Sequence, residues 1–265
     1  MSTPANQVET QLLVDVAEGI ATVTLNRPGQ FNALSDVLIG ELQSAFDRIA
    51  ADSGVRVVVL AANGRGFCAG HDLKEIRAMA GAEEVEALFA RCSRMMLTIP
   101  RLPQPVIAKV HGLATAAGCQ LVATCDLAVA AEEAHFATPG VNIGLFCSTP
   151  MVALSRAVPR KQAMEMLLTG EPIDAPTALR LGLVNRLAPT PQVMEEALSL
   201  ASEIVTKSPL TLKIGKEAFY RQAELGLAAA YDYASQAMTE NMMAIDAQEG
   251  IDAFLQKRKP EWKGC

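Results

Sequence analysis

Two apolar runs, each followed by a tight turn of small residues, constrain the fold of this chain most strongly. The first run covers residues 55–60 (VRVVVL) and leads through NGRG into FCAGHDL at 67–73. The second covers residues 106–110 (VIAKV) and leads through a His-Gly pair into LATAAGCQ at 113–120. Small residues in such turns let a ligand approach the backbone, so that peptide N–H groups can point at a ligand oxygen. Two of these corners can supply two donors to one oxyanion.

The spacing of apolar residues predicts an α/β fold in which strands alternate with helices in the first half and helices alone follow. Strands recur at intervals of roughly 40–50 residues, which favours stacked β-β-α units over a simple β-α repeat. The predicted strands are 12–16, 20–25, 55–60, 106–110 and 127–130. The predicted helices are 37–51, 83–97, 161–169, 175–181, 192–207, 209–222, 225–247 and 249–259.

Composition excludes several classes of protein. The chain has 265 residues, half of them hydrophobic, so one large domain can bury a core. Its net charge of −6 argues against a nucleic-acid binder. The six cysteines lack metal-ligand spacing, so we expect free thiols and no metal site. No apolar run is long enough to span a membrane, and residues 1–7 lack the features of a targeting peptide, so we expect a cytoplasmic location.

One alternative arises in the first corner. Residues 64–69 (GRGFCA) match the pattern G-x-G-x-x-A after a strand, and Glu84 follows about 20 residues on, as in a dinucleotide-binding fold. Against it, no second strand is expected before Glu84 and a helix follows it. A lone match of this kind is a weak signal.

The second corner is more specific. It places Ala114, Ala116, Ala117 and Gly118 at the start of a predicted helix, where free N–H groups and the positive end of the helix dipole lie. Such a site would stabilise a carbonyl oxygen that becomes an enolate. A helix packed closely on a strand needs small residues as well, and the residues alone leave both interpretations open.

The chain resembles the enoyl-CoA hydratase/isomerase (crotonase) superfamily over nearly its whole length. The matching segments, in the family's order, are 26–28 (NRP), 32–34 (NAL), 67–73, 112–126, 136–144, 178–184 and 249–263. The resemblance implies a crotonase-like spiral of stacked β-β-α units with a C-terminal helical trimerisation region. Residues 1–200 would form the core with the acyl-CoA site, and residues 201–265 would serve oligomerisation and site closure. It also implies a homotrimer or a hexamer of two trimers.

The resemblance further assigns an acyl-CoA thioester of fatty acid metabolism as the substrate. Coenzyme A would enter as part of it, with no separate cofactor. The backbone N–H groups of His71 and Ala117 would form the oxyanion hole. The substrate-binding residues would be Arg27, Ala33, Ala69, Gly70, Asp72 and Leu73, together with Phe254 and Lys257 reaching a neighbouring subunit's site. Without the resemblance, the basic run at 257–259 would be read as a stabiliser of a helix dipole.

The chain departs from the hydratases of this superfamily at both of their glutamates. The corresponding positions are Gln120 and Gly140. Hydration needs one group that activates water and one that delivers a proton to the α-carbon, and neither residue can carry a proton at neutral pH. Each lost group typically costs about 10²–10⁴-fold in rate. We therefore expect a lyase-type enzyme that stabilises an enolate but hydrates weakly.

Two other residues keep different functions open. Decarboxylases of the superfamily carry a His at the position of His71 and a tyrosine at that of Cys147, so decarboxylation or thioester hydrolysis is an alternative. Equally, His71 can contribute its N–H alone, and Cys147 can be a small buried hydrophobe. A non-catalytic acyl-CoA-binding protein is the remaining alternative.

Overall fold

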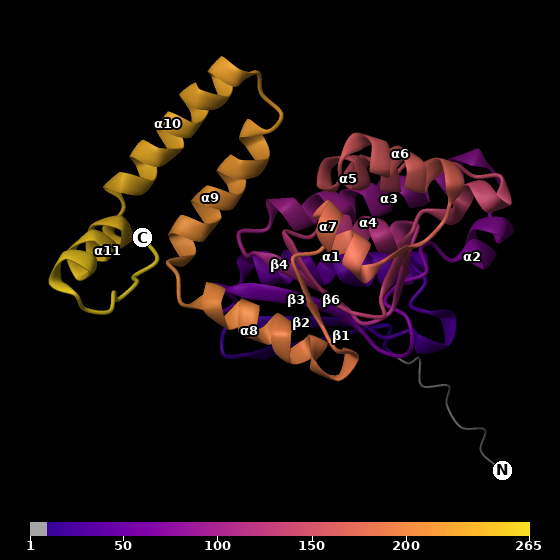
Figure 1. Ribbon diagram of the computed structural model, residues 1–265, viewed down its shortest axis with the longest axis horizontal. Helices are drawn as coiled ribbons and strands as arrows, with labels where there is room; N and C mark the ends of the chain where they lie inside the picture. The colour runs from indigo at the N-terminus through magenta and orange to yellow at the C-terminus, as the bar shows by residue number, and fades with distance from the viewer. Residues whose placement is uncertain (1–9) are drawn as a thin grey trace, which may run out of the picture.

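The computed structural model describes residues 10–265 and contains two sheets surrounded by helices (Figure 1). The larger sheet has the order β1-β2-β3-β4-β6-β9, in which β1 and β2 are antiparallel and the other neighbours are parallel. Its strands are β1 (Leu12–Ala17), β2 (Ile20–Leu25), β3 (Val57–Ala62), β4 (Val106–Val110), β6 (Leu127–Ala131) and β9 (Arg186–Ala188). The smaller sheet consists of β5 (Leu113–Thr115), β7 (His135–Ala137) and β8 (Ile173–Asp174).

Helices cover both faces of the larger sheet. The helices are α1 (Asp36–Ala51), α2 (Leu73–Ala78), α3 (Ala82–Arg101), α4 (Ala117–Thr124), α5 (Pro150–Ala157), α6 (Arg160–Thr169), α7 (Ala175–Leu181), α8 (Val193–Val205), α9 (Pro209–Gln222), α10 (Leu227–Met243) and α11 (Ile245–Gln256). In β3, Val57 and Val59 pack in the cluster under α8, whereas Val58 and Leu60 pack in the main core with α1 and α3. Alternate side chains of a strand point to opposite faces, so a strand covered on both sides is apolar throughout.

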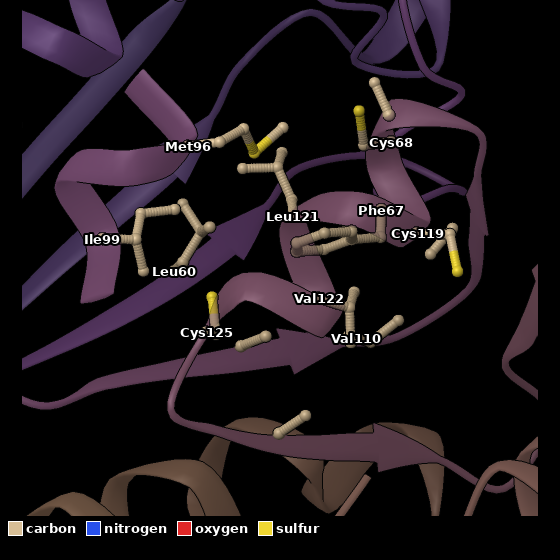
Figure 2. Close-up of a cluster of buried hydrophobic side chains, with 14 of the residues drawn as sticks. Leu60, Phe67, Cys68, Met96, Ile99, Val110, Cys119, Leu121, Val122 and Cys125 are labelled. Carbon is tan, nitrogen blue, oxygen red and sulfur yellow. The ribbon is translucent and has the colours of Figure 1, made fainter. Parts of the chain in front are cut away.

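The main core continues from this sheet into the two corners. Figure 2 shows Phe67 and Cys68 of the first corner beside Cys119, Leu121 and Val122 of α4. Phe67 and Cys68 are fully buried. The small residues of the corners are therefore packed among large apolar side chains, which fixes their backbone.

Most predicted elements are confirmed, and the differences are local. Strand β3 begins two residues later than expected, at Val57. Helix α3 continues through Pro100 to Arg101, because a proline in the last turn loses only one hydrogen bond of a helix that is already ending. An extended residue, Ala244, with ψ 148, splits the helix predicted at 225–247, so the last helix begins at Ile245 and not at residue 249. Ala114 lies in β5 and not at a helix start.

The C-terminal helices α9, α10 and α11 lie to one side of the sheets (Figure 1). The boundary predicted near residue 200 falls inside α8, which packs on the larger sheet, and the division into two functional parts stays a prediction. Residues 1–7, from which location was predicted, lie outside the described residues. Within residues 10–265, none of the helices has the length and apolar character needed to cross a bilayer.

Candidate functional site

The two small-residue corners lie side by side. Phe67 N donates to Leu113 O at 2.9 Å, and Thr115 N donates to Cys68 O at 2.9 Å. Gly70, with φ +93, fits against the second corner because it has no side chain: a Cβ atom there would lie 3.2 Å from Ala117 N. The structure thus brings the backbones of residues 70–71 and 117 together from segments far apart in the sequence.

The backbone N–H of His71 is left free by the pairing of its neighbours. Leu34 N donates to Gly70 O at 2.7 Å, and Asp72 N donates to Leu34 O at 3.0 Å. Successive peptide groups of an extended segment point to opposite sides, so the His71 N–H points away from Leu34. Within the described part of the chain, this N–H has no acceptor.

The N–H of Ala117 is free for a different reason. Ala117 is the first residue of α4, and the first N–H groups of a helix have no partner inside it. The preceding Ala116 adopts φ 50 and ψ −118, a conformation that costs about 1–3 kcal/mol in a residue with a side chain. Ala116 N is held by Ala137 O at 2.9 Å. This strained turn leads directly into the helix N-terminus, so the free N–H groups of His71 and Ala117 lie on neighbouring corners.

The imidazole of His71 is largely buried beside the same corner. It packs edge-on against Phe89, with ring centroids 5.0 Å apart, a contact that the sequence analysis missed. Burial lowers the pKa of His71 to about 4, so the ring is neutral at pH 7. Its Nε2 is buried and has no hydrogen-bond partner among the described residues. A neutral imidazole with one free nitrogen can exchange a proton or a hydrogen bond with a ligand.

Gln120 lies one helical turn after Ala117 on α4 and is only 5% exposed. Its Oε1 is buried without a partner in the described residues, and its side chain lines a cavity of about 1010 Å³. Buried amide oxygens normally accept a hydrogen bond, so an unsatisfied one at a cavity is a candidate ligand contact.

Gly140 is not an empty position that a longer side chain could simply occupy. It lies in the 3₁₀ turn η2 (Pro139–Ile143), and a Cβ atom there would meet Leu145 O at 2.4 Å and Cys147 Sγ at 2.9 Å. The Cys147 thiol therefore stands where a side chain of residue 140 would begin. Burial raises the pKa of Cys147, although a backbone hydrogen bond with Gly140 opposes this, so the thiol is protonated at pH 7.

The predicted coenzyme A contacts divide into two groups. Arg27 and Asp72 form an ion pair with each other at 3.1 Å, and Arg27 also donates to Ala33 O. Burial tends to raise the pKa of Asp72, but the hydrogen bonds from Arg27 and from two N–H groups of α2 lower it overall. The segment from Ala69 to Leu73 belongs to the first corner itself, where Ala69 N donates to Phe31 O at 3.0 Å.

Phe254 and Lys257 are not brought to this site within one chain. Both lie at the end of α11, among the helices beside the sheets (Figure 1), and Phe254 is 82% exposed. Their predicted contact with a neighbouring subunit stays a prediction.

The dinucleotide alternative does not fit the first corner. No helix begins directly at the G-x-G-x-x-A segment, residues 64–69; Cys68 instead pairs with Ala114, and the next helix begins only at Leu73. The next helix, α2, is capped by the Asp72 carboxylate, which accepts from Lys74 N at 3.1 Å and occupies the position that a pyrophosphate would need. Across residues 10–265, no three His, Cys, Asp or Glu side chains gather as metal ligands.

Comparison with known proteins identifies the family of this chain. A family model described as enoyl-CoA hydratase/isomerase matches residues 15–265. The chain belongs to the enoyl-CoA hydratase/isomerase family. A relative from Rattus norvegicus, named enoyl-CoA hydratase domain-containing protein 3, mitochondrial, is 49% identical over 92% of this chain and 82% of its own length.

Solved structures of this family have the same fold. One described as enoyl-CoA hydratase from Mycobacterium smegmatis has a TM-score of 0.94 and 56% identity, covering 96% of this chain and 99% of that one. That of human enoyl Coenzyme A hydratase domain-containing protein 3 has a TM-score of 0.93 and 47% identity, covering 96% and 100%. The predicted spiral of β-β-α units is thereby confirmed.

The predicted cytoplasmic location is wrong. The vertebrate relatives that match over 92% of the chain all carry the word mitochondrial in their names. The prediction rested on the lack of a membrane-spanning run and of a targeting signal in residues 1–7, and neither absence determines a location.

Proposed function

We propose that this protein is an acyl-CoA thioester enzyme that stabilises an enolate with the backbone N–H groups of His71 and Ala117. The observation that carries the proposal is the presence of two free N–H groups on neighbouring corners, one beside a paired strand segment and one at a helix start. Fixed donors aimed at a developing oxyanion contribute about 3–4 kcal/mol each. Coenzyme A is bound as part of the substrate, beside Arg27 and the segment 69–73.

Hydration of an enoyl thioester is weak in this proposal. Hydration adds the hydroxyl of water to the β-carbon and transfers the other water proton to a base. A proton must also be added at the α-carbon. The Gln120 amide can orient water but accepts no proton, and Gly140 has no side chain. The test is turnover of crotonyl-CoA, followed at the enoyl absorbance. Rates like those of ordinary hydratases would contradict the proposal that hydration is weak.

Two variants sharpen that test. Gln120→Glu changes a residue at a cavity and is expected to raise hydratase turnover by about tenfold or more, since one proton-transfer group is restored. Gly140→Glu is expected to add nothing, because its Cβ would meet Leu145 O at 2.4 Å. A gain from Gly140→Glu with none from Gln120→Glu would contradict these roles.

A second candidate function is decarboxylation of a malonyl-type thioester, favoured by the protonated thiol of Cys147 beside Gly140. The bond to the carboxylate breaks, CO₂ leaves, and its electron pair forms the enolate held by the two N–H groups. The α-carbon then takes the thiol proton, and the thiolate regains a proton from water. Release of CO₂ that falls in Cys147→Ala and persists in Cys119→Ala would support this function over hydration.

We also propose a homotrimer or a hexamer, with Phe254 and Lys257 at the coenzyme A site of a neighbouring subunit. The support is the exposure of apolar side chains on α10 and α11. If thioesters bind without turnover of any substrate in a panel, the protein is a non-catalytic acyl-CoA binder.

A further inference from the structure

Helix α11 is joined to the turn between α8 and α9 by the residues 258–265, which we call the return segment. Helix α11 ends at Gln256, and Lys257 has φ 55 and ψ 40, a left-handed conformation that reverses the direction of the chain. The return segment then runs back beside α11 (Figure 1). Trp262 Nε1 donates to Thr206 O, in the α8–α9 turn, at 2.7 Å. The return segment therefore connects the last helix with the point where the chain leaves α8.

Asp246, in the first turn of α11, is the centre of this contact. Its Oδ1 accepts from Lys263 N at 2.6 Å and from Gly264 N at 3.1 Å. Its Oδ2 accepts from Ser208 Oγ at 2.5 Å, and Ser208 is the N-cap residue of α9. Burial tends to raise the pKa of Asp246, but these hydrogen bonds lower it overall, so the carboxylate is charged at pH 7. One buried charge thus holds the return segment, α11 and the start of α9 together.

Glu249, one helical turn after Asp246, holds the beginning of the return segment. Arg258 donates to both of its carboxylate oxygens, with Nη2 2.8 Å from Oε2. Glu261 N donates to Glu249 Oε1 at 2.8 Å. Two-pronged contacts between a guanidinium and a carboxylate fix the orientation of both groups. Because Arg258 directly follows Lys257, this contact also fixes the place of the chain reversal.

The residues that face the return segment lie on one side of α11. Asp246, Glu249 and Ala253 are three and four residues apart, which places them on one face of the helix. Ala253 is 1% exposed, whereas Phe254 is 82% exposed. The return segment thus determines which face of α11 is turned toward the α8–α9 turn, and with it the positions of Phe254 and Lys257.

We propose that Asp246 is a positioning residue for thioester binding: by holding the return segment, it sets where Phe254 and Lys257 reach on a neighbouring subunit. The inference rests on the proposed function, because it takes these two residues as coenzyme A contacts. The ammonium group of Lys257 suits a phosphate of coenzyme A. Asp246 itself is buried in the junction and acts only through the two residues that it positions.

The test is calorimetric titration of the full chain with acetyl-CoA. Asp246→Asn is expected to weaken binding about tenfold, since one oxygen cannot hold all three donors. Trp262→Phe keeps an aromatic ring but loses the donor to Thr206 O, and is expected to weaken binding about threefold. Asp252→Asn, the same change at an exposed position of α11, is the control and is expected to bind as wild type.

A double-mutant cycle separates positioning from general damage to the fold. In a chain that already carries Phe254→Ala and Lys257→Ala, Asp246→Asn is expected to change acetyl-CoA affinity by less than about twofold, because the residues it positions are gone. An equal loss in that chain overturns the positioning role, as does wild-type affinity of both Asp246→Asn and Trp262→Phe. Sedimentation of Asp246→Asn as a smaller assembly than wild type also overturns it, since weaker binding would then follow from dissociation.

Failure of the proposed function gives different results. Wild-type affinity of the chain with Phe254→Ala and Lys257→Ala shows that these residues are not coenzyme A contacts, and removes the basis for the role of Asp246. Absence of acetyl-CoA binding in a wild-type chain that unfolds cooperatively overturns the thioester site itself.

Discussion

Gly70 lies where the two corners meet, and no side chain fits between them. Its φ of +93 is unfavourable for other residues, and a Cβ atom would meet the Ala116 Cβ at 2.8 Å. Gly70→Ala is therefore expected to lower the free energy of unfolding by about 2 kcal/mol or more and to abolish thioester binding. Urea unfolding and calorimetry measure the two effects.

Gly40 provides the matched control for that substitution. It lies in α1 with nothing within 4 Å of its would-be Cβ. Gly40→Ala is expected to stabilise the protein by about 0.5–1 kcal/mol, since alanine favours a helix interior, and to leave binding unchanged. Equal effects of the two substitutions would mean that residue 70 is not confined by the second corner.

His71 makes stability depend on pH in a defined window. Burial lowers its pKa to about 4 in the folded chain, against 6.5 when exposed. Below about pH 6.5 the unfolded chain binds a proton that the folded chain does not, so stability falls as the pH drops toward about 4. Between about pH 6.5 and pH 5 this amounts to about 2 kcal/mol. His71→Gln should remove that part of the pH dependence in urea unfolding; an unchanged dependence would show that the ring is solvated.

At this scale, the sequence predicts what depends on neighbours in the chain. The free N–H of Ala117 follows from small residues before a helix. The contact of Gly140 with Leu145 and Cys147 depends on how a loop folds back, and no local pattern contains it. The same is true of Phe89 against His71, since the two residues are joined only by the packing of α3 on the first corner.

Elements with a clear apolar pattern were predicted well. Helix α1 begins one residue earlier than expected and ends as expected, and strands β2 and β4 have the bounds expected from the sequence. Short elements were missed: β5, β7 and β8 have two or three residues each, too few to establish a period. They pair with each other in a second sheet, so distant partners, rather than their own residues, decide their structure.

Helix α9 is tied to the core by one buried polar cluster. Lys216 Nζ donates to Asp126 Oδ2 at 2.7 Å and to Ile99 O at 2.9 Å, and Tyr220 donates to Asp126 Oδ1 at 2.8 Å. Asp126→Asn leaves the largely buried Lys216 without its countercharge, so the free energy of unfolding should fall by about 3 kcal/mol. Hydrogen exchange should show this loss of stability first in the backbone amides of α9.

An exposed ion pair near the end of the same helix serves as the comparison for this buried cluster. Arg156 and Glu224 lie 3.5 Å apart with 61% and 67% of their side chains exposed. Glu224→Gln is expected to change stability by no more than about 0.5 kcal/mol, because solvent screens exposed pairs. A loss of stability as large as that of Asp126→Asn would contradict the view that burial determines how much these ion pairs stabilise the fold.

No apolar residue of α9 or α10 is fully buried, and α11 has only Asp246 and Ala253 buried. On α10, the exposed residues Leu227, Tyr231, Met238 and Met242 follow each other at intervals of four, seven and four, which places them on one face. An exposed apolar stripe of this kind is typical of a protein interface. The whole molecule therefore contains a surface that one copy leaves uncovered.

The oligomeric state tests this surface directly. Wild type is expected to sediment as a trimer or hexamer, and the double variant Leu227→Glu, Met238→Glu as a monomer, since two charges on the stripe cannot be desolvated in an apolar contact. Leu168→Glu, an equally exposed leucine on α6, is the control and should keep the wild-type state. Because Phe254 and Lys257 follow on the next helix, the monomeric variant should also bind thioesters more weakly if they complete a neighbour's site. A monomeric wild type, or dissociation of the control as well, would show that the stripe does not hold copies together.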